Sequence, residues 1–531
     1  MRSFFGGAVG ALGAFAVLGI TVIACSSSDG ASPGGVTDAG TSGIDGSVDT
    51  SNPDGSTNVP NPDGGVSTTY TAFDINHVLI TGQSNETGND ATTILSTAQP
   101  FTNLMFDTGP MSMQGGFKYS TRGVRGASIT GCDDFGCTSF QVPTSFKPLV
   151  EGDNYFDVSY SDGVNPYIVE TPASGVANEI AKLATSSFGL AKHDVLASVH
   201  GRSGNAYACL RKGGGCDLLS SGNYTAAQYG GRLNSYAQGM MEVTSAKALA
   251  AAGNKSYVVR GVVVVHGEQD SDNYFAGQPD YPIAGTDGVA GEVKDYTDAL
   301  VEWQRDYETG AKAITAQTQA IPMFVSQLSK WGGNLDGRPS SVVAQMQLDA
   351  HIKAPGKVVV IGPSYPLPYN QDDCLHFTSE GERRLGEYFG KVYAQVVIGG
   401  RTWEPLRPKT ITRAGATVTV QYYVPKGPLV FDTTQVTAAS NMGFTLVDAN
   451  GNAATAITNV ALTTPDTVTL TLASDPGASK HLRYAMNRED GACVGPMVGA
   501  RGNLRDSDDI VSQSGGAPLQ NWGVHFDMVV P

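Results

Sequence analysis

A serine follows a short apolar run near residue 80, at a position where open α/β sheets usually carry their chemistry. The run from Val78 to Thr81 is typical of a buried parallel strand, and Gly82-Gln83-Ser84-Asn85 comes directly after it. A glycine permits the sharp turn that ends such a strand, and the turn presents the serine hydroxyl beyond the carboxyl end of the sheet. Ser84 is therefore a candidate nucleophile. The alternative is an ordinary loop serine that caps the end of the strand.

A nucleophilic serine needs a base to accept its proton and a third group to orient that base. The segment Asp372-Asp373-Cys374-Leu375-His376 contains both residue types, with Asp373 three positions before His376. We expect the Asp373 carboxylate to hold one ring nitrogen of His376 while the other nitrogen faces Ser84, in hydrogen-bonded steps of ~3 Å. The alternative is a histidine with a purely structural role.

Two more strand-like runs end in polar residues. His200-Gly201-Arg202-Ser203 follows one run, and His266-Gly267-Glu268 follows another. Parallel strands share a direction, so these ends should meet at one rim, where the Gly201 amide and the His266 ring are candidate donors to an oxyanion. Arg202 would add a charge there, either to recognise an acidic sugar or to pair with a surface aspartate. Ser203 is a weaker candidate nucleophile, because its surroundings do not match a nucleophile elbow.

Three motifs in this order resemble the SGNH hydrolases, and most closely the branch of sialate O-acetylesterases and acetylxylan esterases. They are Gly82-Gln83-Ser84-Asn85, His266-Gly267-Glu268-Gln269-Asp270 and Asp373-Cys374-Leu375-His376. The resemblance implies a flavodoxin-like sheet, with Ser84 as nucleophile, His376 as base and Asp373 as its orienting acid. It also implies an oxyanion hole formed by the Ser84 amide, a glycine amide and a polar side chain of the middle motif. We assign Gly201 and His266 to this hole, with Gln83 and Glu268 in support.

The chain departs from the family pattern at two places. The family's middle motif begins with glutamine where this chain has His266, which donates only in one tautomer and should make activity more sensitive to pH. The family's Gly-Gly-Ser/Thr appears as Gly201-Arg202-Ser203. Glu268 is kept, and it competes with Asp373 as the acidic partner of the base. We favour Asp373.

Apolar runs alternate with helical patterns between about Tyr70 and Gly400. The predicted strands are Val78–Thr81, Val195–Val199, Val258–Val265, Met323–Leu328 and Val358–Ile361. Helical stripes run from Val176 to Phe188 and from Leu385 to Val396, with a capping box formed by Ser379 and Glu382. The alternation predicts an α/β fold of three layers, in which helices cover both faces of a parallel sheet. The Gly-rich piece from Phe101 to Tyr167 does not fit and is predicted to form loops over the carboxyl end of the sheet.

The pattern changes after Arg407 to period-two alternation, separated by Gly, Pro, Asp and Asn. Thr417–Val424, Gly443–Val447 and Thr467–Leu472 show it most clearly. Such strands predict an all-β domain of the sandwich type at 406–531, after a hydrolase domain at 70–405. Few ionisable residues lie at its strand ends, so we expect a structural or glycan-binding role.

The amino terminus has the features of a secretory signal. One arginine precedes an apolar run from Phe4 to Ala24, and Val22-Ile23-Ala24-Cys25 resembles the lipobox of bacterial lipoproteins. The resemblance implies a signal peptide at 1–25, lipidation of Cys25, and an extracytoplasmic protein anchored to the outer membrane or cell surface. An uncleaved anchor is the alternative. Residues 26–69 are rich in Gly, Ser, Asp and Pro without Lys or Arg, and we expect a disordered spacer.

The cysteines suit an exported chain. The seven cysteines leave an even number once Cys25 is set aside. The simplest pairing joins near neighbours, Cys132 with Cys137 and Cys209 with Cys216, and leaves Cys374 for Cys493, although other pairings remain open. The sequence contains no Cys-x-x-Cys and no His pair at helical spacing, so a zinc site is not predicted.

Taken together, these patterns predict a serine esterase that removes O-acetyl groups from carbohydrates through an acyl-enzyme, with no metal or cofactor. A net charge of −16 argues against a nucleic-acid partner. Two alternatives remain: an esterase acting on lipid or polyester, and a non-catalytic glycan-binding surface protein with a degenerate hydrolase fold. The departures at His266 and Arg202 favour the second.

Overall fold

The computed structural model describes residues 56–59, 68–111, 132–133, 136–137, 142–152, 168–214, 235–277, 280–330, 341–486 and 493–531. The predicted signal peptide, Cys25 and most of the spacer lie outside these ranges. The end of the spacer is ordered, contrary to the prediction: β1 (Ser56–Val59) pairs antiparallel with β2 (Thr68–Thr71), and Val59 and Tyr70 are buried. In the part of the chain that the structure describes, no helix is long and apolar enough to cross a membrane.

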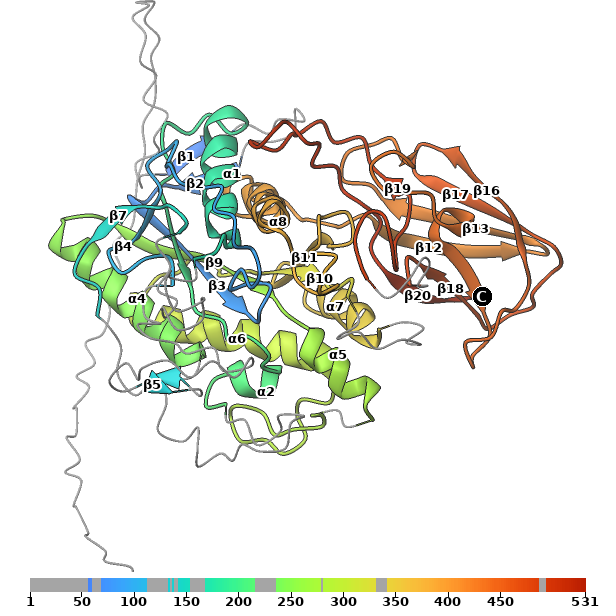
Figure 1. The fold of residues 1–531 in the computed structure, drawn as a ribbon, viewed down its shortest axis with the longest axis horizontal. Coiled ribbons are helices and arrows are strands. Elements are labelled where there is room, and N and C mark those ends of the chain that lie inside the picture. The colour runs from blue at the N-terminus through green and yellow to red at the C-terminus, as the bar shows by residue number, and fades with distance from the viewer. Residues whose placement is uncertain are drawn as a thin grey trace, which may run out of the picture. The chain divides into compact units, whose positions relative to one another are not determined.

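A seven-stranded, mostly parallel sheet forms the centre of the fold, in the order β11-β10-β9-β3-β8-β4-β7 (Figure 1). The parallel strands that match the predicted runs are β3 (Ile75–Gly82), β8 (Val195–Val199), β9 (Tyr257–Val265), β10 (Met323–Gln327) and β11 (Val358–Pro363). Their order is that of flavodoxin-like folds, in which ligands bind beyond the carboxyl ends of the first and third strands. Here those strands are β3 and β9, and the predicted fold class is confirmed.

Both faces of the sheet are buried, which explains why its strands are almost continuously apolar. Along β9, Val263 and Val265 belong to one buried cluster, whereas Val262 and Val264 belong to another on the opposite face. Helices α1 (Pro172–Ser186) and α8 (Ser379–Tyr393) cover the first face, and α4 (Ser235–Ala252) and α6 (Tyr296–Thr315) cover the second (Figure 1). The remaining helical segments are α2 (Tyr207–Leu210), α5 (Glu268–Phe275), α7 (Val342–Lys353), η2 (Ala394–Ile398) and η3 (Ser440–Gly443).

Helices α1 and α8 lie very close together because glycines line their contact. A Cβ added to Gly386 of α8 would lie 2.2 Å from the Pro172 carbonyl oxygen of α1. One turn further on, a Cβ at Gly390 would lie 2.8 Å from the Glu179 Cβ. The loop before α8 carries Asp373 and His376, so this contact helps to hold the loop relative to the rest of the fold.

Two local predictions are wrong. The segment from Phe101 to Tyr167 does not consist only of loops: β4 (Leu104–Phe106) and β7 (Phe146–Pro148) extend the sheet at its edge, and β5 (Cys132–Asp133) pairs with β6 (Gly136–Cys137). Strands this short leave no periodic signal. The capping box at α8 is not formed, because Thr378 is the N-cap and accepts from the Gly381 amide, while the Glu382 carboxylate is buried without a hydrogen bond.

The carboxyl-terminal part is antiparallel β structure, as predicted. One sheet has the order β12-β13-β17-β16, a second has the order β15-β18-β20, and β14 pairs with β19. Their bounds are β12 (Arg407–Ala414), β13 (Thr417–Tyr423), β14 (Val430–Phe431), β15 (Phe444–Val447), β16 (Ile457–Thr464), β17 (Thr467–Leu472), β18 (Lys480–Tyr484), β19 (Leu504–Arg505) and β20 (Phe526–Val530).

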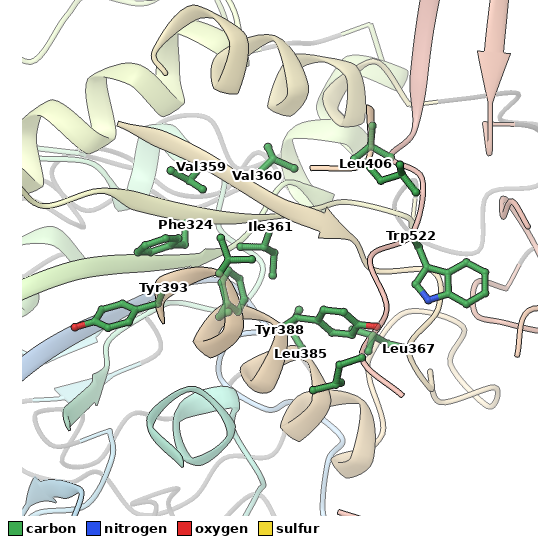
Figure 2. Packing of buried hydrophobic residues seen from close by; sticks show 14 of the residues in the cluster. Phe324, Val359, Val360, Ile361, Leu367, Leu385, Tyr388, Tyr393, Leu406 and Trp522 are labelled. Carbon is green, nitrogen blue, oxygen red and sulfur yellow. The ribbon is translucent and has the colours of Figure 1, made fainter. Parts of the chain in front are cut away.

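This β part shares a core with the α/β part. Figure 2 shows Ile361 of β11 and Tyr388 of α8 in the same cluster as Trp522, from the segment before β20. The Tyr388 hydroxyl donates to the Gln520 carbonyl, and the Gln327 side chain of β10 exchanges two hydrogen bonds of 2.8 Å with the His525 backbone. All described residues accordingly fall in one compact unit.

Candidate active site

Ser84 lies on a tight turn directly after β3, and the turn depends on Gly82. Gly82 has φ of +155°, and a Cβ there would lie only 2.0 Å from the Val265 carbonyl oxygen of β9. The Ser84 carbonyl accepts the Asn89 amide at 2.9 Å, which closes the turn. The Ser84 side chain is therefore positioned at the switch point between β3 and β9.

Asn85 connects the three motifs. Its Nδ2 donates to Glu268 Oε1 at 2.8 Å and to the Leu375 carbonyl at 3.3 Å. Its Oδ1 accepts the Phe377 amide at 3.3 Å. Leu375 and Phe377 flank His376, so one side chain next to Ser84 holds the loop that carries the predicted base.

Gln83 makes the corresponding connection to the middle motif. Its Oε1 faces the amides of Gly267 and Gln269, at 3.5 and 3.3 Å. These contacts fix which end of the carboxamide is the oxygen, and they leave the Nε2 group as a donor on the Ser84 turn. The structure thus brings all three motifs together beyond the carboxyl ends of the central strands.

The Asp373–His376 pair is formed as predicted in geometry. Asp373 Oδ2 lies 2.5 Å from His376 Nδ1, while its Oδ1 accepts the amides of Leu375 and His376. Burial opposes ionisation of Asp373, but the hydrogen bonds from His376 and these amides outweigh it and lower its pKa to about 2. Burial also opposes ionisation of His376 and would lower its pKa. The bonds of His376 to Asp373 and to Asp90 outweigh this effect and raise the pKa to about 9.

The second expected hydrogen bond, between the described side chains of His376 and Ser84, is not formed. His376 Nε2 lies 3.3 Å from Asn89 Nδ2, and no hydrogen bond joins the described side chains of Ser84 and His376. Hydrogen bonds at catalytic sites are often long in the free enzyme and tighten only when substrate binds. The assignment of Ser84, His376 and Asp373 therefore remains a prediction, supported by their proximity.

Gly201 differs from its predicted role. Its amide donates to Glu86 Oε1 at 3.1 Å, and a Cβ at Gly201 would lie 1.9 Å from Glu86 Oε2. Glu86 is fully buried, and burial raises its pKa well above the ordinary value. The Gly201 amide is therefore committed to a carboxyl group inside the protein and does not face an oxyanion.

His266 also differs from its predicted role. Its Nδ1 lies 2.7 Å from the Tyr296 hydroxyl and its Nε2 lies 2.9 Å from the Asn205 carbonyl, so both ring nitrogens are occupied. The ring stacks on Tyr296 and packs edge-on against Trp303. Burial lowers its pKa to about 4, which keeps it neutral. His266 is a satisfied core residue, and the expected pH sensitivity does not arise from its tautomer.

Arg202 does not lie at the rim. Its side chain is buried and donates to the carbonyls of His200 and Gly201 and to Gln238 Oε1. The Arg202 amide donates to the Gly82 carbonyl at 2.9 Å. Arg202 therefore braces its own loop against the Ser84 turn, and it is not placed to recognise an acidic sugar.

Three residues near the site escaped the sequence reasoning: Glu86, Asn89 and Asp90. They lie within six residues of Ser84, in a polar run that could have suggested them. The sequence suggests Ser203 only as a weaker candidate nucleophile, and the structure suggests a different role for it. Ser203 follows Arg202, and its buried hydroxyl has no hydrogen-bond partner in the part of the chain that the structure describes. This hydroxyl is thus an available donor.

Glu268 supports the site without touching the base. Its Oε1 accepts from Asn85, its Oε2 is buried without a partner, and burial raises its pKa. Asp373, by contrast, bonds directly to His376. The geometry accordingly favours Asp373 as the orienting acid.

One group among the described residues has the composition of a metal site: Asp90, Asp373 and His376, whose ligand atoms lie within 4.8 Å of one another. The 2.5 Å between Asp373 Oδ2 and His376 Nδ1 is a hydrogen-bond distance. Two ligands on one tetrahedral zinc ion would stand roughly 3.3 Å apart, given bonds of about 2.0 Å. These residues fit proton sharing better than metal binding.

The predicted disulfide between Cys374 and Cys493 is present. It ties the loop of Asp373 and His376 to the carboxyl-terminal part. Cys132 and Cys137 stand opposite each other in the β5–β6 pair. Cys209 is buried and disulfide-bonded, and its predicted partner Cys216 lies outside the described residues.

Comparison with solved structures finds distant similarity to two proteins. The structure is similar to that of a carbohydrate acetylesterase from Xanthomonas citri, with a TM-score of 0.42 and 13% identity, covering 87% of this chain and 82% of that chain. It is also similar to a protein from Arabidopsis thaliana, with a TM-score of 0.32 and 14% identity, covering 60% of this chain and 98% of that chain. No protein-family model and no curated protein matches the chain. At identities of 13% and 14%, the similarity concerns the fold and gives no information about the residues of the site.

Proposed function

We propose that the protein is a serine esterase that removes O-acetyl groups from carbohydrates. The observation that carries the proposal is the Asn85 network, which holds the Ser84 turn against the loop of the Asp373–His376 pair. A serine, a histidine oriented by a carboxylate, and nearby donors are the groups that acyl transfer requires. The likeness to a carbohydrate acetylesterase agrees with this chemistry at the level of the fold.

The reaction follows from these positions. Ser84 Oγ attacks the acetyl carbonyl while His376 Nε2 accepts its proton, and the oxyanion forms next to the turn. Collapse breaks the bond between the carbonyl carbon and the sugar oxygen, and this oxygen takes the proton from His376 and leaves as a hydroxyl. Water then attacks the acetyl-enzyme in the same way and releases acetate. Asn89 must yield its place beside His376 Nε2, because the serine hydroxyl needs that position.

The donors to the oxyanion are reassigned in this proposal. The Ser84 amide and the Gln83 Nε2 group lie on the turn itself. The third donor is the Ser203 hydroxyl, which has no partner among the described residues and follows Arg202, whose amide bonds to the Gly82 carbonyl of the turn. They replace Gly201 and His266, whose donors are already used inside the protein. Three preorganised donors of this kind stabilise the charge that develops in the transition state.

A fluorophosphonate probe tests the nucleophile. We expect wild-type protein to be labelled and Ser84→Ala to be inert, while Ser203→Ala still reacts. Release of acetate from acetylated xylan, O-acetylated sialic acid and an aryl acetate would establish the substrate class. Labelling that survives in Ser84→Ala would refute the assignment of the nucleophile.

The resting geometry also supports a second candidate, a non-catalytic protein that binds glycans. The observation in its favour is the contact of His376 Nε2 with Asn89 in place of Ser84. A protein that is neither labelled nor active on any of these esters, yet retains acetylated glycan in equilibrium dialysis, would establish this candidate.

The location of the protein is part of the proposal. We infer lipidation at Cys25 and attachment to a membrane surface, from the sequence that precedes the described residues. Metabolic labelling with a fatty acid should mark the wild-type chain and leave Cys25→Ser unmarked. Equal labelling of both chains would refute the anchor.

A further inference from the structure

Asp90 places a second carboxylate on the predicted base. Its Oδ2 lies 3.0 Å from His376 Nδ1, the same nitrogen that Asp373 Oδ2 approaches to 2.5 Å. The two acids come from different segments, since Asp373 belongs to the loop of His376 whereas Asp90 belongs to the Ser84 turn. The His376 ring is buried, and both acids approach it at the same edge.

We propose that Asp90 is a positioning residue that shares the Nδ1 proton of His376 with Asp373 and fixes the ring relative to the Ser84 turn. The inference rests on the proposed esterase function and adds a residue to it. Neither the motif of the first loop nor that of the third predicts this acid.

The backbone around Asp90 ties it to the nucleophile. The Asn89 amide bonds to the Ser84 carbonyl, and the Ala91 amide bonds to the Gly88 carbonyl at 3.0 Å. Asp90 is thus held on the turn that carries Ser84, so its bond to His376 sets the position of the base from the side of the nucleophile. Asp373 holds the same ring nitrogen from the loop of His376 itself.

The conformation of Asp90 agrees with a functional role. Its φ is +66°, in the left-handed region that few residues other than glycine adopt readily, although Asp and Asn tolerate it best. Such positions are strained for residues other than glycine, and they concentrate at functional sites. An Asp90→Asn variant keeps the side-chain shape and tolerates this backbone, so it tests the charge alone.

Among the described residues, the charged groups that interact with His376 are acidic. They are Asp373 from its own loop, Asp90 from the Ser84 turn and Glu268 from the start of α5. Glu268 makes no direct contact with the ring and bonds to Asn85. Removal of the Asp90 charge should therefore lower the pKa of His376, but less than removal of both bonded carboxylates.

The titration of His376 in the full chain measures this directly. Labelling histidine with ¹³C at Cε1 allows the ring to be followed by NMR, with His376→Gln to assign its signal. We expect Asp90→Asn to shift the midpoint down by about one pH unit or more, as loss of an opposite charge at this range does. Asp372→Asn is the matched control, because Asp372 is exposed and its side chain makes no contact with the ring.

The rates provide the second readout. Loss of a sole orienting carboxylate costs about 10⁴-fold in a serine protease. With Asp90 sharing the role, Asp373→Asn should lose no more than about 10²-fold, and the double variant Asp90→Asn/Asp373→Asn should fall to the level of His376→Ala. If Asp373→Asn alone falls to that level, the role of Asp90 is refuted.

The outcomes separate this inference from the proposed function. A protein without esterase activity still has a His376 whose titration either responds to Asp90→Asn, which supports the contact, or does not, which overturns it. A wild-type titration that changes when Zn²⁺ is added and recovers with a chelator would show that the three residues bind metal instead. That result would also overturn the inference.

Discussion

At the scale of single residues, the site depends on which hydrogen bonds are already used. Gly201 and His266 stand at the ends of the expected strands, yet their donors are bound to Glu86 and Asn205. The donors that remain are on the Ser84 turn and at Ser203. The ionisation of His376 is the other decisive property, because only its neutral form accepts a proton.

The activity should depend on pH through His376. Its raised pKa of about 9 keeps the ring charged at neutral pH, so kcat/KM for an aryl acetate should rise with pH through a limb near that value. The raised pKa of His376 contributes stability that is fully present below its unfolded-state pKa of about 6.5 and is lost as the pH rises through 9. Initial rates corrected with Ser84→Ala check the first statement. A rate that is constant above neutral pH would contradict it.

The Ser203 hydroxyl should contribute to the rate and not to stability. Ser203→Ala should lower kcat by about 10²-fold, as loss of one oxyanion donor does, with little change in KM. Removing a buried hydroxyl that has no partner leaves no other group unsatisfied, so the melting temperature should not fall. Thr108→Val removes another buried, unpartnered hydroxyl and serves as the control. Equal kcat in both variants would exclude Ser203 from the site.

These residue-level errors have a physical origin. The sequence places a polar residue at the end of a strand, but it does not say toward which side the group points. Tyr296 and Asn205, which occupy both nitrogens of His266, lie 30 and 61 residues away in the chain. By contrast, Asp373 and His376 are only three residues apart, and a local turn was enough to predict their contact.

At the scale of elements, the strands were predictable because a strand that is buried on both faces must consist mostly of apolar residues. The predicted strand at Val195–Val199 agrees with β8 residue for residue, and β9 and β10 differ from the prediction by one residue at one end. The edge strands β4 and β7 were not predicted, since three residues give no period. The close contact of α1 with α8 was not predicted either, because it depends on which glycines face each other across two distant helices.

That helix contact should tolerate no added methyl group. Gly386→Ala should lower the free energy of unfolding by about 1–3 kcal/mol, because the new Cβ would overlap the Pro172 carbonyl, which lies in the backbone. Gly253→Ala is the control, since the nearest atoms to a Cβ there would be the carbonyl oxygens of Leu249 and Ala250, both at 3.5 Å. Urea denaturation of both variants measures the difference. Equal midpoints would show that the helices separate easily.

At the scale of the whole molecule, the loop of Asp373 and His376 is held from three directions. Asn85 binds it from the Ser84 turn, α8 continues it, and Cys374 joins it to Cys493. Gln371 adds a hydrogen bond of 3.2 Å to the Val494 carbonyl. The carboxyl-terminal β structure therefore helps to position the loop of the predicted base, which agrees with the structural role expected for it.

Loss of the disulfide should affect both stability and activity. The double variant Cys374→Ser/Cys493→Ser should lose about 2–5 kcal/mol of unfolding free energy, because the bond closes a loop with a sequence separation of 119. It should also lose activity in proportion to the disorder of the Asp373–His376 loop. Wild-type protein treated with a reductant should behave in the same way. Full activity in the double variant would mean that hydrogen bonds alone hold the loop.

The bond between Cys374 and Cys493 also determines where and when the proposed active site can be completed. Thiols stay reduced in most cytosols and are oxidised outside them. In a chain still inside the cell, the loop of Asp373 and His376 would lack this covalent bond. The bond also cannot form until synthesis has passed Cys493. The proposed site would thus be completed only after synthesis and in an oxidising compartment. The proposed esterase would therefore not act on esters inside the producing cell.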